Sequence, residues 1–89
     1  DRDSAKQQLF LWLRWWRDLL LVKEGGEEYV LNIDRQAELR LQAAQLTSVQ
    51  IVRFVKRLLE TLEALDRNAR ARLALEMLML DVPVTTVNI

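Results

Sequence analysis

The sequence predicts an all-α fold, a small four-helix array whose helices differ in length. The 89 residues contain only two glycines and one proline, so few positions interrupt a helix. Apolar residues recur every three or four positions over most of the chain, which is the spacing of a helix face. Residues 47–50 (TSVQ) read as a capping box, a motif that marks the start of a helix.

Composition excludes several kinds of chemistry. With no Cys and no His, the chain has no disulfide, no thiolate nucleophile, no imidazole base and no Cys/His zinc site. The two glycines, Gly25 and Gly26, are adjacent. Neither the P-loop motif GxxxxGK[ST] nor the dinucleotide-binding motif GxGxxG can therefore occur. Only carboxylates remain as catalytic candidates, and Glu24, Glu27 and Glu28 cluster in a turn where nothing would raise a pKa. We therefore expect no catalytic, cofactor or metal site, and a protein that is not an enzyme.

Charge and hydropathy give no sign of a polyanionic partner or a membrane. Thirteen Lys and Arg residues balance thirteen Asp and Glu residues, so the whole-molecule field favours neither sign. The longest apolar runs, residues 9–13 and 19–22, are far shorter than the roughly 20 residues of a membrane span.

The first predicted helix covers residues 3–24, with Asp3 as its cap and Gly25 as the left-handed residue that ends it. At 100° per residue its apolar side chains fill about 200° of arc, roughly twice what one core face needs. Trp12 and Trp16 fall near the centre of this arc, which favours the core over a stacking platform for bases. Trp15 falls toward the edge of the arc. We expect this helix to contact both the core and a partner.

The predicted elements after the first helix are shorter. Residues 25–28 form a turn and residues 29–33 an extended connector, with a strand as the less favoured alternative. A short helix then begins at Asp34 and runs to about residue 45. Its predicted inner residues are Ala37, Leu41 and Ala44.

A third helix is predicted from Ser48 to about Asp66, with Leu46 as a hydrophobic staple on Ile51. Its predicted buried residues are Ile51, Val52, Val55, Leu58, Leu59, Leu62 and Leu65. The last helix covers residues 69–81 with Asn68 as its cap, which breaks the chain at residues 66–68 instead of bending one long helix. Because this helix is apolar around most of its axis, we expect it at the centre of the array. Val82-Pro83 ends it, so the predicted domain spans residues 3–82 and the tail residues 83–89.

The candidate interface lies on the first helix. Its residues are Leu11, Arg14, Trp15, Arg17 and Val22, where an apolar arc meets a narrow strip holding Arg14, Arg17 and Asp18. Simple solvation explains that polar strip, but arginines beside apolar residues also suit an interface rim. We expect the isolated chain to self-associate near Leu11, Trp15 and Val22.

A nucleic-acid-binding domain is the alternative. Between residues 53 and 72 there are six basic side chains, and residues 43–49 join a short helix to a longer one as in a helix-turn-helix, with Gln50, Arg53 and Arg57 as base readers. The acids on the same face count against this interpretation. Predicted pairs of Lys56 with Glu60 and of Arg72 with Glu76 favour a solvated, self-compensating surface.

Three segments, in this order, resemble a known family. They are residues 15–23 (WWRDLLLVK), residues 32–34 (NID), and Asn68 followed by residues 72–78 (RLALEML). This arrangement, across about residues 9–82, resembles the C-terminal collar domain of the delta prime subunit of bacterial DNA polymerase III. The collar domain of the related gamma/tau subunit is the alternative, and the NID connector favours delta prime. The resemblance to this clamp-loader family implies a cytoplasmic, bacterial oligomerisation domain that helps assemble the loader of the sliding clamp in DNA replication.

The resemblance also implies which partners and activities to expect. The implied partners are the other clamp-loader subunits, gamma/tau and delta. ATP hydrolysis belongs to other subunits, and no nucleotide, DNA or membrane contact is expected in this segment. The family's upstream ATPase-like domains are absent from the chain, so we expect it to be a fragment, and none of the family's catalytic-type residues maps onto it.

Overall fold

The computed structural model describes residues 1–67 and 70–83, and these residues form an all-α array of four helices. The helices are α1 (Arg2–Lys23), α2 (Gln36–Ala44), α3 (Ser48–Asp66) and α4 (Ala71–Met79). Two short 3-10 turns, η1 (Glu27–Tyr29) and η2 (Ile33–Arg35), lie between α1 and α2. No strand occurs within the described residues, so the predicted fold class is confirmed.

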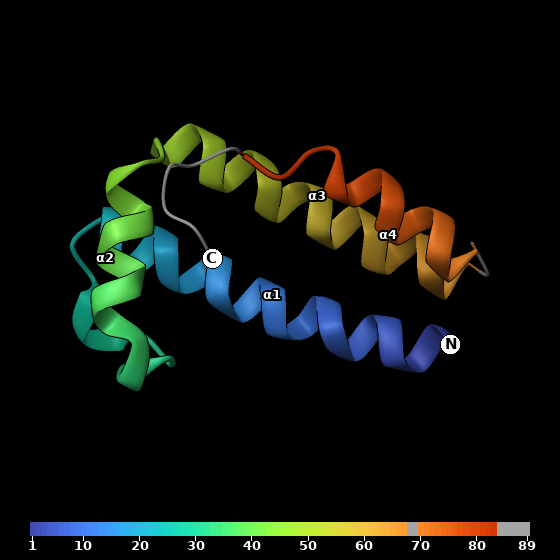
Figure 1. Ribbon diagram of the computed structural model, residues 1–89, viewed down its shortest axis with the longest axis horizontal. Helices are drawn as coiled ribbons and strands as arrows, with labels where there is room; N and C mark the ends of the chain where they lie inside the picture. The colour runs from blue at the N-terminus through green and yellow to red at the C-terminus, as the bar shows by residue number, and fades with distance from the viewer. Residues whose placement is uncertain (68–69, 84–89) are drawn as a thin grey trace.

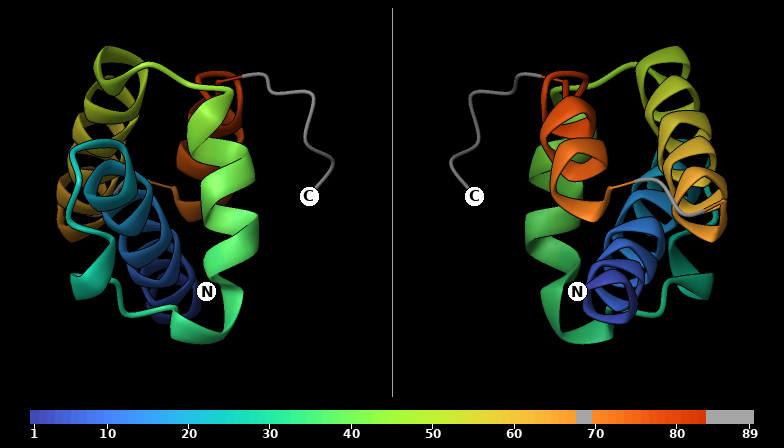
Figure 2. Two further views of the ribbon diagram at one scale, coloured as in Figure 1. Left: turned by 90° about the vertical axis from the view of Figure 1, so that its left-hand side faces the viewer. Right: turned by 90° about the vertical axis from the view of Figure 1, so that its right-hand side faces the viewer.

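The two long helices set the shape of the molecule (Figure 1). α1 and α3 lie side by side and antiparallel, and the 22 residues of α1 span about 33 Å at 1.5 Å per residue, close to the longest dimension of 37 Å. α2 crosses the end where α1 finishes and α3 begins, and α4 returns along α3 in the opposite direction. The two end-on views in Figure 2 show α2 lying across the other helices.

The core forms where α1, α2 and α3 meet. Trp16 of α1 packs on Phe54 of α3 with ring centroids 4.5 Å apart and planes inclined by 54°, a tilted arrangement that aromatic pairs favour. Leu39, Ala43 and Leu46 close this core from α2 and the loop after it, and α4 contributes Leu78.

The ends of α1 follow the sequence with one correction. Asp1, not Asp3, caps the helix: its carboxylate accepts a 2.8 Å hydrogen bond from the Ser4 N–H, and Asp3 lies inside the first turn. Gly25 has a φ of 89°, the left-handed value expected of the residue that ends a helix. Lys23 in the last turn donates to the Ala43 carbonyl at 3.2 Å, which ties α1 to α2.

The connector and α2 differ from prediction. Tyr29 and Ile33 belong to 3-10 turns, so the extended stretch is shorter than residues 29–33. Asp34 lies within η2 and does not cap α2. Arg35 occupies the N-cap position of α2, and its side chain makes no capping hydrogen bond.

The inner face of α2 was predicted wrongly. Leu39, Gln42 and Ala43 are buried, whereas the predicted Ala37, Leu41 and Ala44 are exposed. Two stripes satisfy helix spacing in this segment. The stripe that continues into Leu46 buries both Leu39 and Leu46 in the core, so α2 turns this stripe inward.

The predicted capping box at the start of α3 is confirmed. The Gln50 N–H donates to Thr47 Oγ1 at 3.1 Å, and the Thr47 N–H donates to Gln50 Oε1 at 2.9 Å. The buried face of α3 lies further toward α4 than predicted: Phe54 and Thr61 are buried, whereas Val52 and Leu59 are exposed. Because α4 covers one flank of α3, the core face rotates toward that flank.

Replacing Thr47 by Ala should lower the free energy of unfolding by about 1 kcal/mol, because it removes the acceptor for the Gln50 N–H. Thermal unfolding followed by circular dichroism measures this as a fall in Tm of about 4–8 °C. Val49→Ala, at an exposed position in the same turn, is the control and should change stability by less than about 0.5 kcal/mol. Equal effects of the two substitutions would show that the box contributes nothing.

α4 is not the central helix that its composition predicts. It lies at the periphery against α3, and Leu78 is its only fully buried residue among those described. α3 ends at Asp66 and α4 begins at Ala71, so they are separate helices as predicted. α4 ends at Met79, shortly before Val82-Pro83. The proposed Asn68 cap, the predicted start at residue 69 and tail residues 84–89 lie outside the described residues.

None of the described helices combines the length and apolar character needed to cross a membrane.

Candidate functional site

In the part of the chain that the structure describes, an apolar groove is lined by residues of α1, the η2–α2 segment and the end of α4. It encloses about 600 Å³, within the range of roughly 300–1,000 Å³ typical of ligand pockets. Its lining includes Leu11, Trp12 and Trp15 of α1. The other lining residues are Gln8, Arg14, Trp16, Asn32, Arg35, Gln42, Phe54, Met79 and Val82. We call this feature the Trp groove.

The indole of Trp15 is fixed in place by a polar network. Its Nε1–H donates to Oε1 of Gln42 at 2.8 Å, and Gln42 is only 4% exposed. The guanidinium carbon of Arg35 lies 4.4 Å from the centre of the ring, in cation–π geometry. Arg35 is itself held by Glu38, through Nε–Oε1 at 3.1 Å and Nη2–Oε2 at 2.6 Å. The Trp15 indole in the Trp groove is therefore held by contacts within the chain.

The Arg35–Glu38 pair also perturbs the two pKa values. The hydrogen bond from Arg35 lowers the pKa of the Glu38 carboxyl, and the hydrogen bond to Glu38 raises the pKa of Arg35. Since the folded pKa of Glu38 is depressed, its stabilising effect is present above the unfolded pKa and is lost as the pH falls through the folded value. Both side chains are exposed to solvent, so the effect on stability is small.

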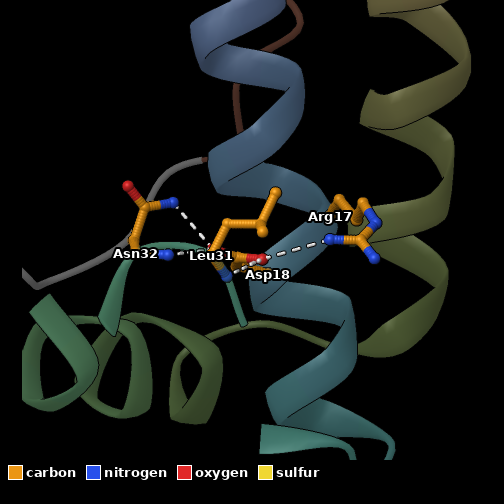
Figure 3. Close-up of polar contacts among 4 residues, drawn as sticks. All are labelled: Arg17, Asp18, Leu31 and Asn32. Atoms are coloured by element: carbon orange, nitrogen blue, oxygen red, sulfur yellow. Dashed lines mark hydrogen bonds and ion pairs between the residues drawn. The ribbon is translucent and has the colours of Figure 1, made fainter. Parts of the chain in front are cut away.

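A buried carboxylate holds the connector that reaches the Trp groove (Figure 3). Asp18 is 0% exposed, and its Oδ2 accepts hydrogen bonds from the Leu31 N–H at 3.0 Å, the Asn32 N–H at 2.9 Å and Asn32 Nδ2 at 2.7 Å. Nη1 of Arg17 lies 3.6 Å from Asp18 Oδ1 and provides a half-exposed counter-charge. We call this arrangement the Asp18 clamp. It fixes Asn32, which lines the groove.

The predicted interface residues separate into two groups. Leu11, Arg14 and Trp15 all line the Trp groove, with Trp15 half-buried at the boundary that its position on the helix wheel suggested. Arg17 is not in the groove but beside Asp18, and Val22 packs half-buried against the core. Leu11, Trp15 and Val22 nevertheless share one face of α1, since they are spaced by four and seven residues, and Trp15 packs against the core as Val22 does.

Asp18 was the clearest error on this helix. The sequence placed it on a solvated polar strip with Arg14 and Arg17, but it is buried and satisfied by backbone donors. Sequence spacing could not reveal this, because its partners lie 13 and 14 residues along the chain.

A second apolar surface lies on the outer side of α4. Leu73, Met77 and Leu80 share one face, since they are spaced by four and three residues, and all three are exposed, Leu80 by 84%. Leu73 and Met77 also line a smaller groove of about 270 Å³ between α3 and α4. The opposite face, with Ala71, Ala74, Leu75 and Leu78, packs on the core. We call the exposed face the α4 stripe.

Three of the six basic residues between positions 53 and 72 form ion pairs with neighbouring acids, namely Arg57, Arg67 and Arg72. Arg57 binds Asp81 at 2.7 Å and Glu60 at 2.9 Å. These hydrogen bonds raise the pKa of Arg57, and the one to Asp81 contributes most. The predicted Arg72–Glu76 pair is present at 3.9 Å, but Glu60 pairs with Arg57 and not with Lys56. Because Arg57 is paired and Gln50 is used in the capping box, two of the three proposed base readers are already occupied.

The acidic turn after α1 has structural partners. Ser48 Oγ donates to Glu24 Oε2 at 2.6 Å, and Glu27 pairs with Arg40. No group of three or more metal-ligating side chains occurs within residues 1–67 and 70–83.

No protein-family model, curated protein or solved structure matches this chain.

Proposed function

We propose that the chain is an oligomerisation domain of the clamp-loader collar type, which joins its parent subunit to sister subunits of the loader during DNA replication. The observation that carries the proposal is the α4 stripe. α4 has apolar residues on both faces, but α3 and the core cover only one of them. A helix of this composition belongs between two layers, and a sister subunit would supply the second.

The size of the exposed side chains supports an assembly role. Leu73, Met77 and Leu80 occupy consecutive turns, and full burial of each would contribute roughly 1.5–3 kcal/mol. Scattered exposed apolar residues are normal on a monomer, but a contiguous patch on one helix face is typical of an interface. The flanking Arg72 and Glu76 provide the charged rim that such interfaces carry.

The segments that resemble the clamp-loader family include this surface. Residues 72–78 form most of α4 and contain Leu73 and Met77, while residues 15–23 form the second half of α1. Residues 32–34 carry Asn32, which the Asp18 clamp holds. The resemblance and the α4 stripe thus concern the same part of the chain, which supports gamma/tau and delta as partners.

Co-assembly with those partners tests the proposal. We expect the chain to co-elute with gamma/tau and delta subunits from the same genome in size-exclusion chromatography with light scattering. Leu73→Glu combined with Met77→Glu should weaken this assembly by roughly a hundredfold, because it places two carboxylates in an apolar contact. Both positions are exposed, so the double variant should retain its helical circular dichroism spectrum.

Leu41→Glu is the matched control, since Leu41 is an exposed leucine on the outer side of α2. It should assemble like the parent chain. Absence of co-elution by the parent chain, or equal loss in both variants, contradicts the proposal. In the same experiment, the molar mass of the chain run alone tests the expected self-association. A gel shift with duplex DNA that weakens steeply with added salt would favour the nucleic-acid-binding alternative instead.

A further inference from the structure

The Trp groove is distinct from the α4 stripe. Its lining includes Leu11, Trp12 and Trp15, none of which the assembly proposal uses. A residue serving only the core would be buried like Trp16, yet Trp12 and Trp15 stay half-exposed and Leu11 is exposed. Their exposed surfaces line the same groove, and neither the core nor the α4 stripe accounts for this exposure.

The groove is built with little freedom left in its walls. Gln42 and Arg35 hold the Trp15 indole, and Glu38 holds Arg35. On the same side, the Asp18 clamp fixes Asn32. Tryptophan and arginine are the residues most enriched at binding hot spots, and pre-organised side chains lose less entropy when a ligand binds.

The positive charge of the Trp groove favours a ligand with a negatively charged group. Among the described residues that line the groove, Arg14 and Arg35 are the charged ones, and none is Asp or Glu. Arg35 is neutralised by Glu38, whereas Arg14 is exposed and has no ion-pair or hydrogen-bond partner among the described residues. A ligand that carries a carboxylate next to an apolar anchor would pair with Arg14 while its anchor contacts the indoles.

We propose that the Trp groove binds a short amphipathic protein segment whose large apolar side chains are flanked by Asp or Glu. The lining favours such a segment over a nucleic acid, because one unpaired arginine cannot neutralise a run of phosphates, while seven apolar residues suit apolar anchors. This role is independent of subunit assembly through the α4 stripe.

Matched peptides in solution test the proposal. The probes are short, end-blocked peptides without Trp that carry Leu and Phe anchors on one helix face, with Glu, Gln or Lys at the flanking positions. Because Trp12 and Trp15 line the groove, binding should shift the intrinsic tryptophan emission of the full chain. We expect affinity to fall in the order Glu, Gln, Lys, by roughly tenfold from first to last. Replacing the anchors by Ala should abolish binding.

Two variants identify the site. Arg14→Glu should reverse the charge order, so that the Lys peptide binds best. Arg53→Glu, at an exposed arginine of α3 outside the groove, should leave the order unchanged. Neither substitution changes the α4 stripe, so peptide binding and co-assembly through that stripe are tested by separate variants, and the two proposals fail independently.

The proposal is wrong if no anchored peptide binds, if the three flanking residues give equal affinities, or if Arg14→Glu leaves their order intact. It is also wrong if peptides bind only after residues 84–89 are removed, because the groove then serves a segment of this chain.

Discussion

Replacing Asp18 by Ala is expected to lower the free energy of unfolding by about 3 kcal/mol. The substitution removes the acceptor for the N–H groups of Leu31 and Asn32 and for the Asn32 side-chain amide. Hydrogen bonds to a charged group contribute roughly 1.5–3 kcal/mol each, and water at the half-exposed Asn32 should recover part of the loss. Urea unfolding followed by circular dichroism measures the change.

Asp34→Ala is the control for Asp18→Ala. Asp34 is an exposed acid in the turn that follows the clamp, and its removal should change stability by less than about 0.5 kcal/mol. Because Asn32 lines the Trp groove, Asp18→Ala should also weaken peptide binding under conditions where the variant is folded. A variant as stable as the parent would mean that the buried carboxylate does not hold the connector.

Phe54→Ala is expected to be the most destabilising single change, by about 3–5 kcal/mol. Phe54 is 1% exposed and packs on Trp16 between the two long helices, so truncation leaves a cavity at their contact. For a domain of this size each kcal/mol lowers Tm by about 4–8 °C, so the variant should be partly unfolded at moderate temperature.

Phe10→Ala provides the matched comparison. It removes another phenylalanine side chain, from a position of α1 that is 54% exposed. We expect the free energy of unfolding to fall by less than about 1 kcal/mol. If the two alanine variants unfold at similar urea concentrations, the contact between α1 and α3 is not the centre of the core.

The candidate site was predictable only in part. The broad apolar arc of α1 singles out Leu11 and Trp15, the polar strip beside it singles out Arg14, and all three line the Trp groove. Gln42 and Arg35, which fix the Trp15 ring, were missed because they come from a segment whose rotation was mispredicted. No local pattern indicates which glutamine will accept an indole N–H.

The prediction for α4 failed for a different reason. Apolar residues all around a helix indicate that two surfaces must be covered, but not that both covering layers belong to the same chain. The structure covers Leu78 and leaves Leu73 and Met77 exposed. This exposed face of an all-round apolar helix is the feature on which the assembly proposal rests.

The sequence by itself determined the helices and most of their boundaries. The capping box before α3 and the left-handed Gly25 after α1 were readable because they depend on hydrogen bonds and backbone angles within a few residues. Only the tertiary structure decided which face of α2 points inward, that Asp18 is buried, and that α4 lies outside. Those outcomes depend on which distant surfaces and backbone donors meet, and periodicity along a single helix carries no information about them.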